Sequence, residues 1–333
     1  MKIIALVQAR VGSTRLPGKV LKKIAKRSII DLLLTRLSIL KKIDQIIVVT
    51  SKNIKDTILK DEVESVGFEC FRGSEDDVLQ RYYDAAKKYR ADIIVRITGD
   101  CPLIDASLVD SCIENFLSSR VDYYSNTLPV SYPDGLDVEV MSFVSLEKAH
   151  FKAYSKFDRE HVTPFIRNSD EFSKKSLVYK LDLSKLRWTL DEPEDFQVIS
   201  RVFEHFSPSI SFTWEDILEL KNNCPDIFLD NQFIENNEGS NMGKGQKLYK
   251  RARKVIPGGN MLLSKRPEMF LPEKWPAYFS KAKGCKVWDL DGEELVDMSI
   301  MGIGTNILGY GHPEVDEAVK RTVVDGNMST LNC

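Results

Sequence analysis

Three basic residues follow the first apolar run of the sequence. Arg10, Arg15 and Lys19 come directly after a run long enough to form a strand buried on both faces. The turn that holds them is punctuated by Gly12 and Gly18. Backbone N–H groups and fixed cations suit phosphate, because neither has to rearrange to meet the phosphate oxygens. The stretch therefore predicts an anion site, with a solvated basic turn as the alternative.

The spacing of this loop differs from that of a Walker A loop. Five residues separate Gly12 from Gly18 where the motif has four, and Val20 stands where the motif has the Ser or Thr that binds magnesium. The loop therefore predicts phosphate binding without the geometry of a P-loop kinase.

Two aspartates could hold the divalent cation that accompanies a nucleoside triphosphate. One or two carboxylates usually bind this cation, whose charge offsets that of the phosphoryl oxygens. Asp100 directly follows a predicted strand, and Asp191 comes just before a helix that starts at Pro193. Either aspartate could instead cap a helix or a turn. Together with the basic loop they predict a Mg²⁺ site.

Composition limits the class of protein. The chain has 333 residues, 43% of them hydrophobic, which is enough for two folded domains. Its net charge of -2 argues against a nucleic-acid surface. The six cysteines form no C-x-x-C pair, which favours reduced thiols in a cytoplasmic protein. No segment resembles a signal peptide or a long apolar span, so we expect no membrane association.

Apolar runs and helical patterns alternate over the first 120 residues. They predict a helix after a capping box of Ser74 and Asp77. The other predicted elements here are strands at 3–7, 45–51 and 93–98 and helices at 29–40, 56–67 and 107–119. Such alternation is typical of an α/β fold with a mostly parallel sheet and helices on both faces. Ligands bind these sheets at the carboxyl ends of the strands, where the basic loop and Asp100 lie.

The next hundred residues are less regular. The patterns predict strands at 137–140 and 176–183 and helices at 145–150 and 158–168. Two further helices are predicted to begin near Pro193 and after Thr213, which is a plausible N-cap.

Residues 230–243 are polar and rich in Asn and Gly, as a linker should be. We therefore expect one domain over residues 1–229 and a small, incomplete α+β module over residues 244–333. In this module a helix is predicted at 246–256, followed by a β-hairpin around an Asp-Gly turn. That turn explains Asp289 and Asp291 better than a glycosyltransferase D-x-D motif does.

Five motifs of the first domain together resemble a known family. QARVGSTRLPGKVL, RITGDCPLID, YPDGLDVEV, REHVTPFIRN and WTLDEPEDF, in this order, are similar to the spore-coat polysaccharide cytidylyltransferases, which are related to CMP-KDO and acylneuraminate cytidylyltransferases. The resemblance implies a Rossmann-like, GT-A-like nucleotidyltransferase fold and a homodimer. It also implies that CTP and Mg²⁺ are used to join CMP to an acidic sugar, with release of pyrophosphate.

The resemblance assigns roles to residues in these motifs. It implies catalysis by Arg10, Arg15, Lys19 and Asp100, and Mg²⁺ binding by Asp100 and Asp191. The residues implied to bind the nucleotide are Gln8, Ala9, Gly12, Ser13, Ser74 and Arg81. The residues implied to bind the sugar are Asp137, Glu139, Arg159, Glu160 and His161.

The last ninety residues resemble a different family. KLYKRARKVIPGGN, GCKVWDLDGEELVDM and NILGYGHPEVDEAV are similar to the amino-terminal region of class III aminotransferases, the group that contains glutamate-1-semialdehyde aminomutase. Such enzymes bind pyridoxal phosphate through a lysine Schiff base. No lysine in residues 244–333 matches that position, so we expect neither pyridoxal phosphate nor aminotransferase activity in this chain.

Two other functions fit parts of the pattern. One is a glycosyltransferase that uses a nucleotide-sugar donor, and the other is a non-catalytic nucleotide- or sugar-binding remnant of a truncated fusion. Three cations at the phosphate end favour an entering triphosphate, and residues 1–225 contain no convincing D-x-D after a strand. These features favour the cytidylyltransferase.

Overall fold

The first apolar run forms β1 (Ile3–Gln8), an inner strand of a seven-stranded sheet with the order β5-β4-β1-β6-β8-β7-β9. β5 (Glu69–Gly73), β4 (Gln45–Ser51), β1 and β6 (Ile93–Thr98) run parallel to one another. β8 (Glu139–Ser142) lies antiparallel to both β6 and β7 (Tyr123–Ser125), and β9 (Lys174–Ser176) is parallel to β7. The prediction of a mostly parallel sheet is confirmed.

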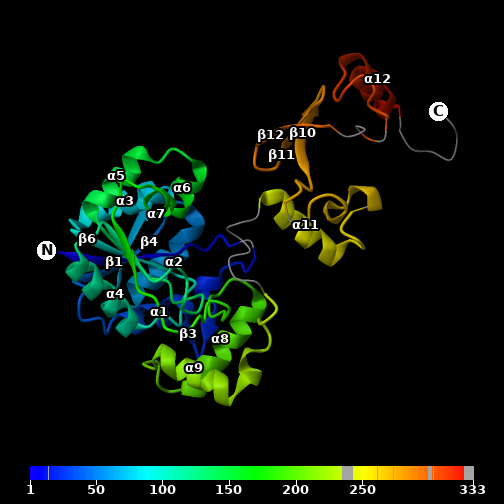
Figure 1. Ribbon diagram of the computed structural model, residues 1–333. Coiled ribbons are helices and arrows are strands. Elements are labelled where there is room, and N and C mark those ends of the chain that lie inside the picture. The colour runs from blue at the N-terminus through cyan, green and yellow to red at the C-terminus, as the bar shows by residue number, and fades with distance from the viewer. Residues whose placement is uncertain are drawn as a thin grey trace. The chain divides into compact units, whose positions relative to one another are not determined.

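The computed structural model describes residues 1–13, 15–234, 243–260, 262–272, 274–298, 302 and 304–325. The chain divides into two units, Met1–Asn236 and Asn237–Cys333 (Figure 1). In the described part, every helix is too short or too polar to cross a lipid bilayer.

Helices cover both faces of the sheet, as predicted (Figure 1). On one face, α1 (Ile29–Leu37), α2 (Thr57–Ser65) and α4 (Ala106–Ser119) pack against alternate residues of β1, including Ala5 and Val7. On the other face, Ile4 and Leu6 contact the core formed with α3 (Val78–Tyr89), α5 (Phe143–Lys152) and α7 (Pro164–Asn168). Because both faces are covered, β1 is apolar throughout.

A third core lies beneath two later helices. α8 (Pro193–Phe206) has Pro193 in its first turn, and α9 (Trp214–Asn223) begins with a capping box of Thr213 and Asp216, so both predicted helix starts are confirmed. Their apolar faces pack around Trp188 and Leu103. The shorter elements of this unit are η1 (Lys19–Leu21), β2 (Lys23–Ile24), β3 (Arg27–Ser28), η2 (Ile54–Asp56) and η3 (Pro225–Phe228).

Two predictions about local structure were wrong. The helix expected at 158–168 is two helices, α6 (Lys156–His161) and α7, because Val162 has a φ of 72° and Pro164 has no N–H to continue the first helix. The strand expected at 176–183 ends at Ser176. Beyond it, the N–H of Tyr179 donates to the Ser131 hydroxyl, which draws the chain away from the sheet.

Two other predicted boundaries differ from the structure. The N-cap of α3 is Asp77, whose carboxylate accepts the N–H of Gln80, while the Ser74 hydroxyl accepts the N–H of Asp77. The strand predicted at 137–140 begins at Glu139, where pairing with Arg96 of β6 starts.

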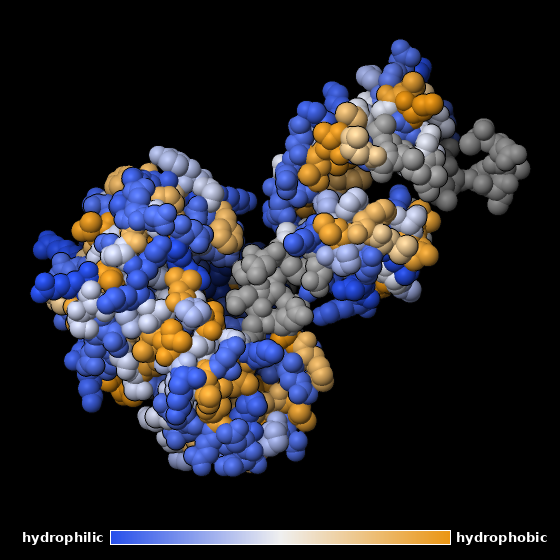
Figure 2. Space-filling model, viewed as in Figure 1, coloured by the Kyte–Doolittle hydropathy of each residue, from blue (hydrophilic) through white to orange (hydrophobic). Residues whose placement is uncertain are grey.

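The second unit has little core of its own. It contains α11 (Lys244–Val255), α12 (Pro313–Val324) and a sheet of β10 (Phe279–Lys283), β11 (Lys286–Asp289) and β12 (Glu294–Val296), with the short η4 (Leu263–Lys265) and η5 (Pro267–Met269). Among the described residues of this unit, the buried apolar side chains are those of Tyr249, Ala252 and Pro267. Figure 2 shows hydrophobic residues gathered on its surface.

The Asp-Gly turn predicted in this unit joins β11 to β12. The Asp289 carboxylate accepts the N–H groups of Asp291 and Glu293, each at 2.8 Å. Asp289 therefore caps the turn, which confirms the hairpin interpretation of the D-x-D pattern.

Candidate functional site

The basic loop and Asp100 meet because their strands are neighbours. β1 and β6 pair in parallel as far as Gln8 and Thr98, so both chains leave the sheet at the same edge. The N–H of Gly99 donates to Gln8 O at 2.7 Å, and a Cβ at Gly99 would lie 2.8 Å from that of Ala9. A residue without a side chain is needed for this close approach.

A buried arginine of α1, Arg36, holds the loop after β6 through hydrogen bonds to its carbonyl groups. Arg36 donates from Nε to Ile104 O at 3.1 Å and from Nη2 to Leu103 O at 3.3 Å. Asp100 O in turn accepts the N–H of Leu190 at 2.8 Å. This hydrogen bond joins the residues just before Asp191 to the loop that carries Asp100.

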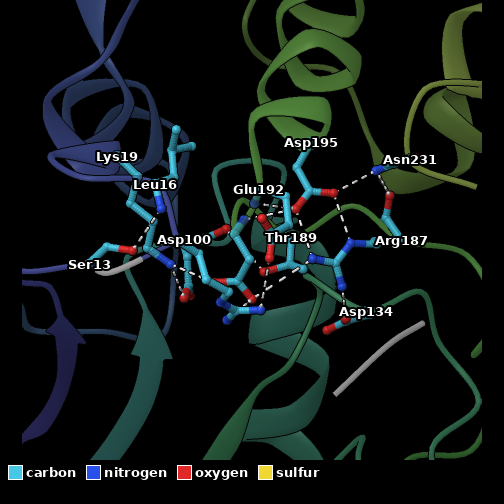
Figure 3. A network of polar contacts seen from close by, with 12 residues as sticks. Ser13, Leu16, Lys19, Asp100, Asp134, Arg187, Thr189, Glu192, Asp195 and Asn231 are labelled. Atoms are coloured by element: carbon cyan, nitrogen blue, oxygen red, sulfur yellow. Dashed lines mark hydrogen bonds and ion pairs between the residues drawn. The ribbon is translucent and has the colours of Figure 1, made fainter. Parts of the chain in front are cut away.

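The Lys19 ammonium lies between two carboxylates (Figure 3). Its Nζ is 2.8 Å from Asp100 Oδ2 and 2.8 Å from Asp191 Oδ1. Burial alone would lower the pKa of Lys19, but the two carboxylates outweigh it and raise that pKa to about 12. Burial would likewise raise the pKa of Asp100, but Lys19 outweighs it and lowers that pKa to about 2. Both groups are therefore charged at neutral pH.

The other two cations of the loop lie closer to solvent. Arg15 Nη2 is 2.9 Å from Asp191 Oδ2, and its Nη1 is 3.7 Å from Glu192 Oε1. Arg10 is exposed. The structure thus brings Arg15, Lys19, Asp100 and Asp191 together, with Arg10 at the start of the same loop.

Many of the backbone N–H groups of the loop are already used inside the protein. Val11 N–H donates to Asp56 Oδ1 at 2.7 Å, and the Ser13 and Gly18 N–H groups both donate to Val11 O. Ser13 Oγ accepts the N–H of Leu16. These bonds fix the loop conformation, and the N–H groups that they use are not directed at a ligand. The side-chain cations therefore supply more of the anion-binding capacity of the loop than the sequence suggested. Thr14 lies outside the described residues.

Three residues predicted to contact the nucleotide lie on different elements: Gln8 ends β1, Ser74 follows β5 and Arg81 is on α3. Arg81 is buried and donates from Nε to Ser74 O at 2.7 Å and from Nη2 to Glu75 O at 3.0 Å. Its Nη1 is buried without a hydrogen-bond partner in the described part of the chain. Gln8 Oε1 accepts from Arg96 Nη2 at 3.4 Å.

The two acidic residues of GLDVEV differ in their surroundings. Glu139 is 4% exposed, pairs with Arg96 and accepts the Tyr123 hydroxyl at 2.5 Å. These contacts make Glu139 part of the sheet. Asp137 is half-buried, and burial followed by the charges of Asp134 and Glu139 raises its pKa to about 7.

Arg159, Glu160 and His161 of the REHVT motif lie on α6. Arg159 donates from Nε and Nη2 to the Asp77 carboxylate and from Nη1 to His150 O at 2.6 Å. A substrate carboxylate would therefore have to displace Asp77. Glu160 is exposed, and the His161 ring lies 4.5 Å from that of Phe157.

Sequence reasoning missed the residues on the far side of Asp191. Figure 3 shows Arg187 in contact with Asp134, Asp195 and Asn231, and its Nη2 lies 4.0 Å from Asp191 Oδ2. Arg187 was visible as a basic residue four positions before Asp191, but only packing shows what it contacts. Asn231, which falls in the predicted linker, is 3% exposed and bonded within the first unit, while residues 235–242 lie outside the described part.

The donors present fit Mg²⁺. In the described part of the chain, no cluster of three or more His, Cys, Asp or Glu side chains could hold a metal ion. Mg²⁺ needs fewer protein ligands, because it keeps waters and takes phosphate oxygens. Asp100 and Asp191 already meet at a single cation, the Lys19 ammonium.

Comparison with known proteins gives matches for the first unit. A family model described as Cytidylyltransferase matches residues 4–229. The spore coat polysaccharide biosynthesis protein SpsF of Bacillus subtilis is 30% identical over 232 residues, which are 67% of this chain and 95% of SpsF. A solved cytidylyltransferase structure from Leptospira borgpetersenii superposes with a TM-score of 0.66 at 35% identity, covering 68% of this chain and 97% of that one.

The C-terminal part matches a different protein. Glutamate-1-semialdehyde 2,1-aminomutase of Acetivibrio thermocellus is 41% identical over 85 residues. These residues are 26% of this chain and 19% of the aminomutase. The chain therefore spans about a fifth of that relative, which agrees with the fusion inferred from the motifs.

Proposed function

The chain belongs to the cytidylyltransferase family, and we propose that its first unit transfers CMP from CTP to the hydroxyl of an acidic sugar, releasing pyrophosphate. One observation carries the proposal. Two loop cations, Arg15 and Lys19, and two carboxylates, Asp100 and Asp191, converge at the edge where β1 and β6 end. The name of the SpsF relative supports a product used in surface polysaccharide synthesis.

The reaction needs positive charge at the triphosphate. The sugar oxygen bonds to the α-phosphorus and loses its proton, while the bond from that phosphorus to pyrophosphate breaks and its electron pair leaves with pyrophosphate. Arg15, Lys19 and Arg10 would stabilise the charge that builds on these oxygens. Lys19 would exchange a carboxylate for a phosphate oxygen in doing so.

Asp100 and Asp191 would hold Mg²⁺. When bound, this ion would offset the negative charge of the phosphate oxygens. Without the ion, the two carboxylates would keep the Lys19 ammonium at the edge where β1 and β6 end.

The remaining assignments complete the proposal. The base and phosphates would be bound by Gln8, Ala9, Gly12, Ser13, Ser74 and Arg81. Asp137 would face the sugar from the segment just before β8, and the other sugar-side candidates are Glu139, Arg159, Glu160 and His161. We also propose a cytoplasmic homodimer, with residues 1–229 as the catalytic domain.

For residues 244–333 themselves we propose no aminotransferase activity. None of their lysines matches the Schiff-base position, so these residues would give pyridoxal phosphate no covalent attachment. Absorbance of the purified chain with added pyridoxal phosphate tests this, and an aldimine band would contradict it.

A pyrophosphate-release assay separates the candidate functions. CTP, Mg²⁺ and a panel of acidic and neutral sugars should give turnover with CTP and an acidic sugar. Turnover of UDP-sugars without CTP consumption would identify a glycosyltransferase instead. Nucleotide binding with no turnover on any sugar would support a non-catalytic remnant.

A further inference from the structure

The chain at Asp191 is held by the side chain of Asp195. Asp195 Oδ2 accepts the N–H groups of Asp191 at 2.9 Å and of Glu192 at 2.8 Å. Asp195 lies in the first turn of α8 and is fully buried. The Asp195 carboxylate therefore fixes the backbone of Asp191. Because it is buried, this carboxylate cannot contact a substrate.

Arg187 binds the same carboxylate and also faces Asp191. Its Nε and Nη2 donate to the two oxygens of Asp195 at 2.8 Å each, a bidentate pair that fixes the guanidinium plane. Nη2 lies 4.0 Å from Asp191 Oδ2, and Nη1 lies 3.7 Å from Asp134 Oδ2. Asp191 is thus approached by Arg187 in addition to the two loop cations.

Asn231, from a segment distant in sequence, binds both Arg187 and Asp195. Its Nδ2 donates to Arg187 O at 3.0 Å and to Asp195 Oδ1 at 2.9 Å. Both hydrogens of one amide are used, so Asn231 fixes Arg187 and Asp195 relative to each other. Figure 3 shows the chain of contacts running from Asn231 through Asp195 to the site.

We propose that Arg187, Asp195 and Asn231 are positioning residues that set the affinity of the Asp100–Asp191 pair for a divalent cation. The inference rests on the proposed function for the identity of that cation as the Mg²⁺ used with CTP. Each of the three side chains is at most 6% exposed, so none reaches the nucleotide. Residues that orient metal ligands typically change metal affinity 10- to 100-fold when mutated.

The test compares three variants at the contacts that α8 makes with Asp230 and Asn231. Asn231→Ala removes the amide behind Asp195. Arg201→Ala removes a surface ion pair of 2.9 Å between α8 and Asp230, the neighbour of Asn231, and serves as the matched control. Asn231→Asp is a stronger second variant, because it places a carboxylate against Asp195. Melting temperatures establish that each variant folds.

The main measurement is the affinity of the full chain for Mn²⁺. Electron paramagnetic resonance measures it, with and without CTP. We expect Asn231→Ala to weaken Mn²⁺ binding about 10-fold, Asn231→Asp to weaken it further, and Arg201→Ala to leave it within about twofold. In the pyrophosphate assay, Asn231→Ala should raise the Mg²⁺ concentration needed for half-maximal rate by a similar factor. Its kcat at saturating Mg²⁺ should stay close to that of the wild type.

Unchanged Mn²⁺ affinity in folded Asn231→Ala would overturn the inference. So would an equal loss in Arg201→Ala, which would indicate general loosening, or a wild-type chain that binds no Mn²⁺. If the wild type binds Mn²⁺ but releases no pyrophosphate with any sugar, the proposed function fails, and the Mn²⁺ comparison still decides the role of Asn231.

Discussion

Replacing Lys19 by methionine removes the cation that lies between Asp100 and Asp191 while keeping a long, unbranched side chain. The pKa of Lys19 is raised from 10.5 to about 12, which corresponds to about 2 kcal/mol of folding free energy at 1.36 kcal/mol per pKa unit. Because the folded-state pKa is the higher one, this contribution is complete below pH 10.5 and is lost as the pH rises through about 12. The lowered pKa of Asp100 describes the same contact and is not added.

We therefore expect Lys19→Met to lower the unfolding free energy of the first unit by about 2 kcal/mol at pH 7 in the presence of a chelator. This should lower the melting temperature by roughly 4–8 °C, since a domain of this size loses about 2–4 °C per kcal/mol. Added Mg²⁺ should restore much of the loss, because a metal ion can take the place of the ammonium between the carboxylates. Turnover should fall about 100- to 1,000-fold and should not recover, because a cation at the triphosphate is lost.

Scanning calorimetry with and without Mg²⁺ measures the stability, and pyrophosphate release measures the turnover. Lys23→Met is the matched control, because Lys23 is an exposed lysine four residues along the same segment and should change neither quantity. An unchanged melting temperature for Lys19→Met in chelator would refute the electrostatic reasoning. Full activity would refute the role of Lys19 at the triphosphate.

Three further predictions concern other parts of the chain. Asp100→Ala should abolish pyrophosphate release while circular dichroism shows an intact fold, and near-normal turnover would exclude Asp100 as a metal ligand. The pKa of Asp137 is raised to about 7 by burial, so its ionisation destabilises the fold as the pH rises from about 4 through 7. Asp137→Asn should therefore melt higher than the wild type at pH 8 and equally at pH 4 by calorimetry; an equal difference at both values would contradict this. Limited proteolysis should cut first between about Asp230 and Gln246, where the sequence is polar and rich in Asn and Gly. Mass spectrometry of the fragments checks this, and a first cut inside residues 1–220 would contradict the domain boundary.

Local pattern was sufficient for much of the fold. Continuous apolar runs predict β1 and the strand at 45–51, and capping of free N–H groups predicts the helix starts at Pro193 and Thr213. Residues close in sequence determine these elements. The parallel arrangement of β1 and β6 then places Lys19 and Asp100 at one edge. The sequence alone therefore predicted that Lys19 and Asp100 follow the carboxyl ends of strands, and the pairing of β1 with β6 showed that these strands are neighbours.

Tertiary packing decided which partner each charged group takes. Arg159 looked available for a substrate carboxylate, yet Asp77, 82 residues earlier, binds it. Glu139 is buried against Arg96 of the adjacent strand, and Asn231 closes the network behind Asp191 instead of lying in a linker. A buried charge must be paired, but any of several residues of opposite charge would satisfy that need in sequence. Only the folded chain, which brings distant segments within about 3 Å, selects one of them.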